Sequence, residues 1–373
     1  MTISQRRDRL RARLVAAELD AMLVTDLVNV RYLSGFTGSN AALLIRADDE
    51  TPVLATDGRY RTQAAQQAPD AELCIQRACG PHLAGRAGAD GVRRLGFESH
   101  VVTVDGYETL TSALGAAAGV ELVRAAGTVE ALREVKDAGE VALLRLACEA
   151  ADAALADLVK RGGLRPGRTE KEVGRELEAL MLDHGADGVS FETIVATGAN
   201  SAIPHHRPTD DVLAAGDLVK IDFGALVCGY HSDMTRTFVL GRAAQWQLDI
   251  YELVATAQKA GREALAPGVA LRDVDAASRQ VIADAGYAEN FGHGLGHGVG
   301  LQIHEAPGIN AAAAGTLLAG AAVTVEPGVY LPDRGGVRIE DTLVVCEATV
   351  EPQGRRHQTS DLLTRFPKEL AIL

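Results

Sequence analysis

Apolar positions in the first 125 residues alternate between the period of an amphipathic helix and the short runs of a buried strand. The helical period predicts helices over residues 5–19, 59–67 and 103–117. Short apolar runs bounded by turn residues predict strands at residues 21–25, 41–45, 52–56 and 94–97. Because both kinds of element alternate, we expect an α/β domain at this end of the chain.

A longer helical pattern covers residues 128–161, with a break expected near Gly139, and it ends at Gly162 and Gly163. A pair of glycines is a typical helix stop. At 373 residues the chain is long enough for two or three domains. We place the boundary near residue 126, which gives an N-terminal domain of residues 1–126 and a second domain of residues 127–373.

The second domain contains an internal repeat. The segment LRPGRTEKEVGRELEALMLDHG (residues 164–185) aligns with LAPGVALRDVDAASRQVIADAG (residues 265–286) at a constant offset of 101. Each copy is a Pro-Gly turn followed by an amphipathic helix, and in the first copy Thr169 and Glu172 form a capping-box pattern. Two related helices at this spacing predict a duplicated structural unit.

Polar residues follow each copy in the same order. The matched pairs are His205 with His304 (offset 99), Asp222 with Glu326 (offset 104) and Asp233 with Glu340 (offset 107). We therefore predict two α+β halves related by a pseudo-twofold axis. Each half is expected to contribute one hairpin with two acids to a shared central site.

Asp222 and Asp233 lie in the stretch LVKIDFGALVCGYHSDMTRTFVL. If residues 218–226 and 229–240 are strands folded about the midpoint between Val227 and Cys228, the two carboxylates face each other directly. Like charges in that position destabilise a sheet. A buried pair would need a cation or a shared proton, whereas a pair at a solvent-facing edge would need neither.

Three later segments hold further candidate metal ligands: FGHGLGHGVGLQIHEAPG, VTVEPGVY and GGVRIEDTLVV. They add His297, Glu326 and Glu340 to the two aspartates. Four carboxylates balance the charge of two divalent cations. Oxygen-rich ligation with one imidazole favours Mn(II), with Co(II) or Zn(II) as alternatives. Two such ions can hold a hydroxide and polarise a carbonyl, which predicts hydrolysis.

Three histidines, His293, His297 and His304, lie among closely spaced glycines, which suggests unusual backbone dihedrals or close backbone approach. The spacing of the first two matches a zincin helix, but the adjacent glutamate is absent and the glycines would break a helix. His205, after ATGANSAIP, is either a surface-loop residue or part of the site entrance. Arg338 shares a strand face with Glu340 and is expected to hold a ligand carboxylate.

Composition excludes several function classes. The net charge of −13 argues against nucleic-acid and anionic-membrane partners. The five cysteines show no CxxC spacing and are interpreted as reduced thiols. The N-terminal segment lacks the apolar stretch of a secretory signal, and no window approaches the length of a membrane span. These features together predict a cytoplasmic protein.

The motifs DFG, GYHSDMTRTF, HGLGHGVGLQIHE, VEPG and RIED occur in an order that resembles the pita-bread metallopeptidases, in their Xaa-Pro aminopeptidase and prolidase branch. The resemblance covers essentially the whole chain. It implies an N-terminal α/β domain followed by a pita-bread catalytic domain. It also implies cleavage of the bond before proline in peptides with proline at the second position, and a homodimer or homotetramer.

The same resemblance assigns roles to single residues. It implies that the metal ligands are Asp222, Asp233, His297, Glu326 and Glu340. Within this set, Asp233 and Glu340 would bridge both metals, and Glu326 would also lie near the nucleophilic hydroxide. The resemblance further implies that His205 and His304 steady the tetrahedral intermediate and that His293 lines the substrate pocket.

Several activities fit the pattern. An Xaa-Pro aminopeptidase is favoured by the FTGSNA segment (residues 36–41) and by the compact length, and an Xaa-Pro dipeptidase is the first alternative. A creatinase-like C–N hydrolase, which works without metal, would be expected to have lost the acids. A non-catalytic scaffold of this fold would be expected to have lost the ligands and to carry basic extensions.

Overall fold

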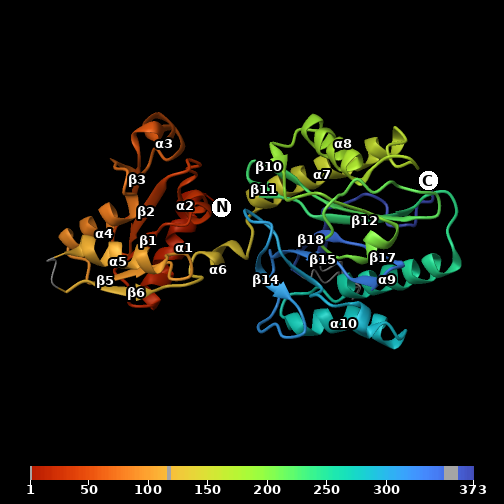
Figure 1. Cartoon of the computed structure of the whole chain (residues 1–373). Helices are drawn as coiled ribbons and strands as arrows, with labels where there is room; N and C mark the ends of the chain where they lie inside the picture. The colour runs from red at the N-terminus through yellow and green to blue at the C-terminus, as the bar shows by residue number, and fades with distance from the viewer. Residues whose placement is uncertain (1, 116–118, 348–359) are drawn as a thin grey trace, which may run out of the picture. The chain divides into compact units, whose positions relative to one another are not determined.

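The computed structural model describes residues 2–115, 119–347 and 360–373. The chain forms two compact units, of which the first ends at Arg133 and the second spans Glu134–Leu373 (Figure 1). The boundary expected near residue 126 lies in the first unit, just before the short helix α6 (Glu130–Arg133). Within the described residues, no helix combines the length and the apolar character that a membrane crossing requires.

The first unit is built on a six-stranded mixed sheet in the order β4-β3-β2-β1-β5-β6. Its strands are β1 (Ala21–Val24), β2 (Ala41–Arg46), β3 (Val53–Thr56), β4 (Glu72–Ile75), β5 (Arg94–Phe97) and β6 (Glu121–Arg124). Its other helices are α1 (Ile3–Ala16), α2 (Leu27–Ser34), α3 (Arg61–Gln67), α4 (Cys79–Ala89) and α5 (Val104–Leu114). The predicted α/β domain is confirmed.

The four strands predicted in this unit are present within about one residue of their expected bounds. The two strands that were missed, β4 and β6, are the edges of the sheet and are largely exposed or half-buried. An edge strand contacts a neighbour on one side only, so it needs no continuous apolar run. The last two residues of the helix expected over 103–117 lie outside the described residues.

The expected helix over residues 128–161 is interrupted between α6 and α7 (Ala138–Lys160). Asp137 caps the second helix, because its side chain accepts hydrogen bonds from the amides of Gly139 and Glu140. Gly139 is therefore part of a helix start. The predicted break is real, and a capping aspartate causes it.

The second unit contains the predicted duplication. Helix α8 (Glu170–Asp183) and helix α10 (Leu271–Asp284) have equal length and lie 101 residues apart. Gly167 and Gly268, before these helices, both have positive φ, 91° and 82°. That conformation favours glycine and explains the repeated Pro-Gly pair. Helix α7 packs on α8, and α9 (Gln245–Glu263) packs on α10, so each half has one helix pair (Figure 1).

Each half also supplies three strands in the same order. In the first half the sheet order is β12-β9-β8, formed by β8 (Ile194–Thr197), β9 (Leu218–Phe223) and β12 (Met234–Val239). In the second half the matching strands are β13 (Gly296–Gly298), β15 (Ala322–Val325) and β18 (Asp341–Val345), which are neighbours in the order β13-β15-β18. The pseudo-twofold arrangement of two α+β halves is confirmed.

The other described strands are β7 (Gly188–Val189), β10 (Ala225–Val227), β11 (Tyr230–His231), β14 (Glu305–Ile309), β16 (Gly328–Leu331), β17 (Gly335–Arg338) and β19 (Ser360–Leu362). Strands β14 and β19 extend the sheet of the second half, whereas β11-β10-β7 and β16-β17 are separate small sheets. Each half has its own apolar core beneath its helix pair, with Leu177 and Ile221 buried in the first and Val274 and Val323 in the second. Burial of one such side chain stabilises the fold by roughly 1.5–3 kcal/mol.

The register of the first hairpin differs from the expectation. Asp222 pairs with Thr235, and Leu226 pairs with His231, so Asp222 and Asp233 do not face each other. The turn is formed by Cys228 and Gly229, which both have positive φ (47° and 78°), as a two-residue turn of type I′ requires. The expected midpoint was one residue too early. A shift of two positions in pairing leaves both aspartates on the same face, because side chains alternate along a strand.

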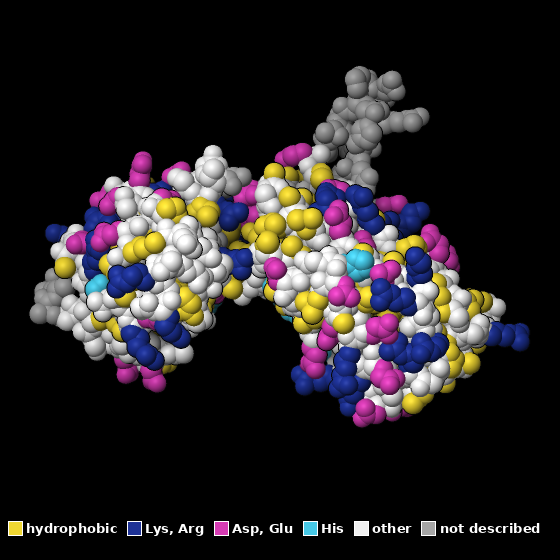
Figure 2. Space-filling view, turned by 90° about the horizontal axis from the view of Figure 1, so that it is seen from above, with side chains coloured by type: hydrophobic (Ala, Val, Ile, Leu, Met, Phe, Trp, Pro, Cys, Tyr) yellow, Lys and Arg dark blue, Asp and Glu magenta, His cyan; other side chains and the backbone are white. Residues whose placement is uncertain are grey.

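Charged side chains of both signs are interspersed over the face seen in Figure 2. The net charge of −13 is therefore not gathered into a single acidic patch on that face. The acids that carry the chemistry are buried in the second unit.

Gly224 separates β9 from β10 at the point where the hairpin bends. A Cβ atom at this position would lie 1.9 Å from the carbonyl oxygen of Ser232. We expect Gly224→Ala to lower the free energy of unfolding by roughly 3 kcal/mol, because a backbone atom cannot move aside without breaking the strand pairing. Chemical denaturation in the presence of chelator measures this change.

The matched control is Gly188→Ala in the adjacent β7, where an added Cβ meets nothing within 4 Å. This variant should unfold within about 1 kcal/mol of the parent. Equal stability of the two variants would contradict the proposed steric requirement at Gly224.

Candidate metallopeptidase active site

The candidate site is a cavity of about 270 Å³ in the second unit, lined by residues from both halves. All five sequence-predicted ligands line it: Asp222, Asp233, His297, Glu326 and Glu340. His205 and His304 line it too, and both side chains are exposed to the cavity. His293 and Arg338 are not on the cavity wall. The structure thus brings together seven of the nine predicted site residues, with the other two behind them.

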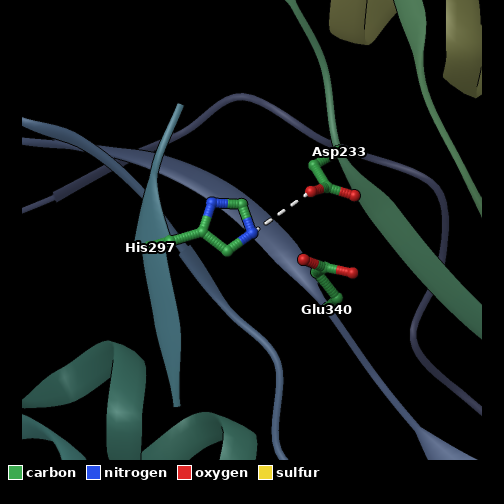
Figure 3. Close-up of side chains that lie close together, drawn as sticks. All are labelled: Asp233, His297 and Glu340. Carbon is green, nitrogen blue, oxygen red and sulfur yellow. Dashed lines mark ion pairs between the residues drawn. The ribbon is translucent and has the colours of Figure 1, made fainter. Parts of the chain in front are cut away.

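Three of the ligand candidates are close enough to share one ion. Asp233, His297 and Glu340 each offer an atom, and these atoms all lie within 4.8 Å of one another (Figure 3). Asp233 precedes β12, His297 lies in β13 and Glu340 precedes β18, so both halves contribute. Donor atoms from three strands that converge in this way form a typical divalent-metal arrangement.

The imidazole of His297 is oriented by its own backbone neighbour. Its Nδ1 lies 3.0 Å from the carbonyl oxygen of Gly298, which accepts the N–H of this tautomer. The other nitrogen, Nε2, lies 3.5 Å from both Asp233 Oδ2 and Glu326 Oε1. The nitrogen lone pair therefore faces the carboxylates, as a metal ligand requires.

Asp222, which lies in β9, is the fourth acid of the site. One of its oxygens pairs with the guanidinium of Arg338. Its other oxygen, Oδ1, is buried and has no hydrogen-bond partner among the described residues. Buried polar atoms are almost always satisfied, so an unpaired carboxylate oxygen beside three further acids fits a bound cation.

Burial governs the electrostatics of the acids. Loss of hydration raises the pKa values of Asp233 and Glu340 well above their ordinary range, and the neighbouring carboxylates raise them further. Burial also raises the pKa of Glu326 to about 8. Deprotonated carboxylates at this density need compensating positive charge. One arginine is not enough for four acids, and divalent cations fit the remainder.

Arg338 on β17 is fully buried and holds the acids in place. Besides pairing with Asp222, it donates to Thr235 Oγ1 at 3.0 Å and to the hydroxyl of Tyr330 at 2.8 Å. Thr235 Oγ1 in turn donates to Glu340 Oε2 at 2.6 Å. The guanidinium thus orients acids of both halves. Arg338 was expected to hold a ligand carboxylate, whereas Thr235 and Tyr330 were not anticipated.

The histidines occupy three different environments. The ring of His304 lies 4.4 Å from the ring of His297 in an edge-on contact, and burial lowers the pKa of His304. His293 lies behind the cavity wall, where its Nε2 is 2.8 Å from the hydroxyl of Tyr330. Burial lowers the pKa of His293 to about 4, so its imidazole is neutral at pH 7. The expected contact of His293 with substrate gains no direct support from this position.

Other buried polar side chains near the site were missed from the sequence. Glu170 at the start of α8 accepts a hydrogen bond from His206, and the amino group of Lys220 donates to the carbonyl of Ile203. Lys136 forms a buried ion pair with Glu305, the residue after His304, at 2.7 Å. The partners in these pairs lie between 17 and 169 residues apart, so no local pattern predicts them.

The raised pKa values predict how the metal-free protein responds to pH. A carboxyl group with a higher pKa in the folded than in the unfolded chain binds more protons when folded, so stability falls as pH rises between the two values. For Glu326 that interval runs from about 4.3, the unfolded value, to about 8. We expect the thermal midpoint in chelator to fall across this interval, and Mn(II) to remove the decline.

Glu326→Gln is the control for this prediction. Without the titrating carboxyl group, the decline between about pH 4.3 and 8 should be shallower in chelator. A variant with the same pH dependence as the parent would contradict the assignment of the slope to Glu326.

A duplicated α+β unit that gathers four carboxylates and a histidine around one cavity fits a metal-dependent hydrolase. Comparison with known proteins gives the family. Residues 142–347 match metallopeptidase family M24, and residues 6–135 match the creatinase/prolidase N-terminal domain. The chain belongs to metallopeptidase family M24, and the resemblance seen in the sequence motifs is confirmed.

Similar proteins extend over the whole chain. The uncharacterized peptidase YqhT of Bacillus subtilis is 39% identical over 359 residues, which are 95% of this chain and 96% of that protein. An Xaa-Pro dipeptidase from Bacillus anthracis has a similar structure, with a TM-score of 0.91 and 38% identity over 100% of both chains. An X-Pro aminopeptidase from Thermotoga maritima has a TM-score of 0.87 and 32% identity over 98% of this chain and 99% of that chain. The chain is therefore a metallopeptidase of the pita-bread fold, and its family implies divalent metals.

Proposed function

We propose that this metallopeptidase is an exopeptidase that hydrolyses the bond between an N-terminal residue and a following proline. The observation that carries the proposal is the buried cluster of acids with one unsatisfied oxygen, Asp222 Oδ1, on the wall of a small cavity. The similarity to an Xaa-Pro dipeptidase and to an X-Pro aminopeptidase supports the specificity for proline. A bond before proline lacks an N–H, so it calls for a dedicated enzyme.

Five side chains would hold two divalent cations in this proposal: Asp222, Asp233, His297, Glu326 and Glu340. Carboxylate oxygens dominate the set, which favours Mn(II), with Co(II) or Zn(II) as replacements. When bound, the ions supply Lewis-acid polarisation of the peptide carbonyl and activation of water. The charge of two divalent ions would balance the four carboxylates.

The protein's own groups orient and stabilise the reacting peptide. His205 and His304 line the cavity from different halves, so an N–H from each can donate to the carbonyl oxygen as negative charge develops there. His304 has a lowered pKa and is neutral at pH 7, which still leaves one N–H to donate. Arg338 and Thr235 keep the acids in fixed orientations throughout.

The length of the substrate separates two candidate activities. The chain length and the FTGSNA segment favoured an aminopeptidase. Similarity to the Xaa-Pro dipeptidase from Bacillus anthracis, at higher identity and over the full length of both chains, now supports a dipeptidase more strongly. We therefore propose the dipeptidase first and the aminopeptidase as the second candidate.

Kinetics on peptides of two lengths test this choice. With Mn(II) present, a dipeptide such as Ala-Pro should be cleaved with a kcat/KM at least about tenfold above that of Ala-Pro-Ala if the protein is a dipeptidase, because a dipeptidase binds the substrate's C-terminal carboxylate next to proline. A dipeptide without proline, Ala-Ala, is the control and should be cleaved more slowly than Ala-Pro. Preferential cleavage of the tripeptide would overturn the dipeptidase and support the aminopeptidase.

Removal of one proposed ligand tests the metal site. Asp233→Asn should abolish Mn(II)-dependent hydrolysis and reduce the number of ions bound in calorimetry. The metal-free variant should still fold, because the change relieves repulsion among buried carboxylates. Asp187→Asn, which alters an acid that accepts the Cys228 amide outside the cavity, is the control. Near-normal turnover of Asp233→Asn would show that the proposed ligand role is wrong.

We further propose that the protein works in the cytoplasm as a homodimer or homotetramer. The five cysteines are free thiols, which suits a reducing compartment. The oligomeric state follows from the resemblance to the family, and light scattering of the purified protein measures it.

A further inference from the structure

His205 lies in a segment that the strands do not hold. Residues 204–208 belong to no helix or strand, and their backbone forms a turn at residues 204–205. His205 and His206 both line the cavity, but His205 is exposed whereas His206 is buried. A side chain that is to meet a reacting carbonyl must be held to within about 1 Å. Some other contact must therefore fix this segment.

Buried side chains hold the segment on either side of His205. Before it, the amino group of Lys220 lies 2.6 Å from the carbonyl oxygen of Ile203 and 3.3 Å from that of Pro204, which also accepts from Arg338 at 3.2 Å. After it, the carboxylate of Glu170 accepts from His206 Nε2 at 2.7 Å and from both the amide and the hydroxyl of Thr209 at 2.8 Å. Lys220 and Glu170 are both completely buried.

Glu170 gathers more donors than a helix start requires. Its second oxygen accepts from the amide of Thr197 at 2.8 Å and from the side chain of Asn200 at 3.0 Å, so five donors converge on one carboxylate. Burial alone would raise the pKa of Glu170, but the hydrogen bonds lower it below its ordinary value. The group is therefore a fixed negative charge at neutral pH.

The internal repeat shows that the helix itself does not need this carboxylate. Glu170 opens α8, and the equivalent first residue of α10, 101 positions later, is the buried Leu271. Both helices begin after the same Pro-Gly turn and have the same length. The carboxylate is present only in the half that carries the His205 segment.

We propose that Glu170 is a positioning residue for hydrolysis, which acts by anchoring residues 206–209 so that His205 is held in place at the cavity wall. The inference rests on the proposed role of His205 in Xaa-Pro cleavage. Glu170 touches neither substrate nor metal in this proposal. It acts through His206 and Thr209, with Lys220 fixing the other side of the segment.

The variant Glu170→Gln tests the anchor with almost no change in volume. The amide replaces one acceptor oxygen with a donor that points at other donors, so at least two hydrogen bonds are lost. We expect kcat for Ala-Pro to fall about ten- to a hundredfold with KM changed less than about twofold. Glu172→Gln is the matched control, since Glu172 lies in the same first turn, caps the helix and does not contact the segment.

A double-mutant cycle separates positioning from general stability. If Glu170 acts through His205, Glu170→Gln should cause no further loss of kcat in a His205→Ala background. A loss of the same factor in both backgrounds would overturn the proposal. If Glu170→Gln proves unstable, Thr209→Val removes a hydroxyl donor from the other end of the same contact, outside the cavity lining, and is used in the cycle instead.

Hydrogen exchange provides a readout that needs no turnover. The amide of Thr209, which donates to Glu170, should exchange faster in Glu170→Gln than in the parent and in Glu172→Gln, while amides of β9 and β12 should keep their protection. Unchanged exchange at Thr209 would overturn the anchor whatever peptides are cleaved. Absence of Xaa-Pro hydrolysis in the parent, with faster exchange in the variant, would reject the proposed function and leave the anchor supported.

Discussion

Four carboxylates buried around one small cavity are the constraint on which the second unit depends. Each buried ionised group costs several kcal/mol unless opposite charge or hydrogen bonds compensate for it. The described chain supplies one arginine against these acids, together with hydroxyl donors such as Thr235. The fold therefore has to be stable enough without metal to bring the acids together, and it leaves a charge deficit that divalent cations can fill.

That requirement explains why the site lies between the halves. Each half places one acid in or just after its second strand and another just before its third strand, and neither half alone reaches the charge that two cations need. The apolar cores lie beneath separate helix pairs, so each half can stabilise its own strands. The apolar cores thus lie away from the junction between the halves, and the acids lie at it. Apolar packing and charge repulsion therefore act on different parts of the second unit.

The sequence predicted the duplication and its acids because both follow from spacing. The two helices have equal length at an offset of 101, and the acids follow at offsets of 104 and 107. These spacings can be recognised without knowing the strand register. The strand register was misjudged because the apolar pattern does not locate the turn. A type I′ turn needs positive φ at two neighbouring residues. Gly229 was a visible candidate for one of them, but nothing in the sequence indicates that Cys228 adopts positive φ as well.

The residues behind the cavity could not be predicted in the same way. Glu170 in a first helical turn looks like an ordinary capping acid, and Lys220 interrupts an apolar strand without a visible partner. Their contacts join positions that only the folded chain brings together. Tyr330 follows the VEPG motif closely, but its hydroxyl has a role only because Arg338 and His293 reach it from other segments.

The difference between Glu170 and Leu271 shows what duplication within one chain permits. Two identical halves in a symmetric assembly would have to place the same residue at both helix starts. In this chain the two positions differ, because α8 begins with a buried carboxylate that holds a loop and α10 begins with a buried leucine. The site is therefore twofold in its acids and asymmetric in the loop that carries His205.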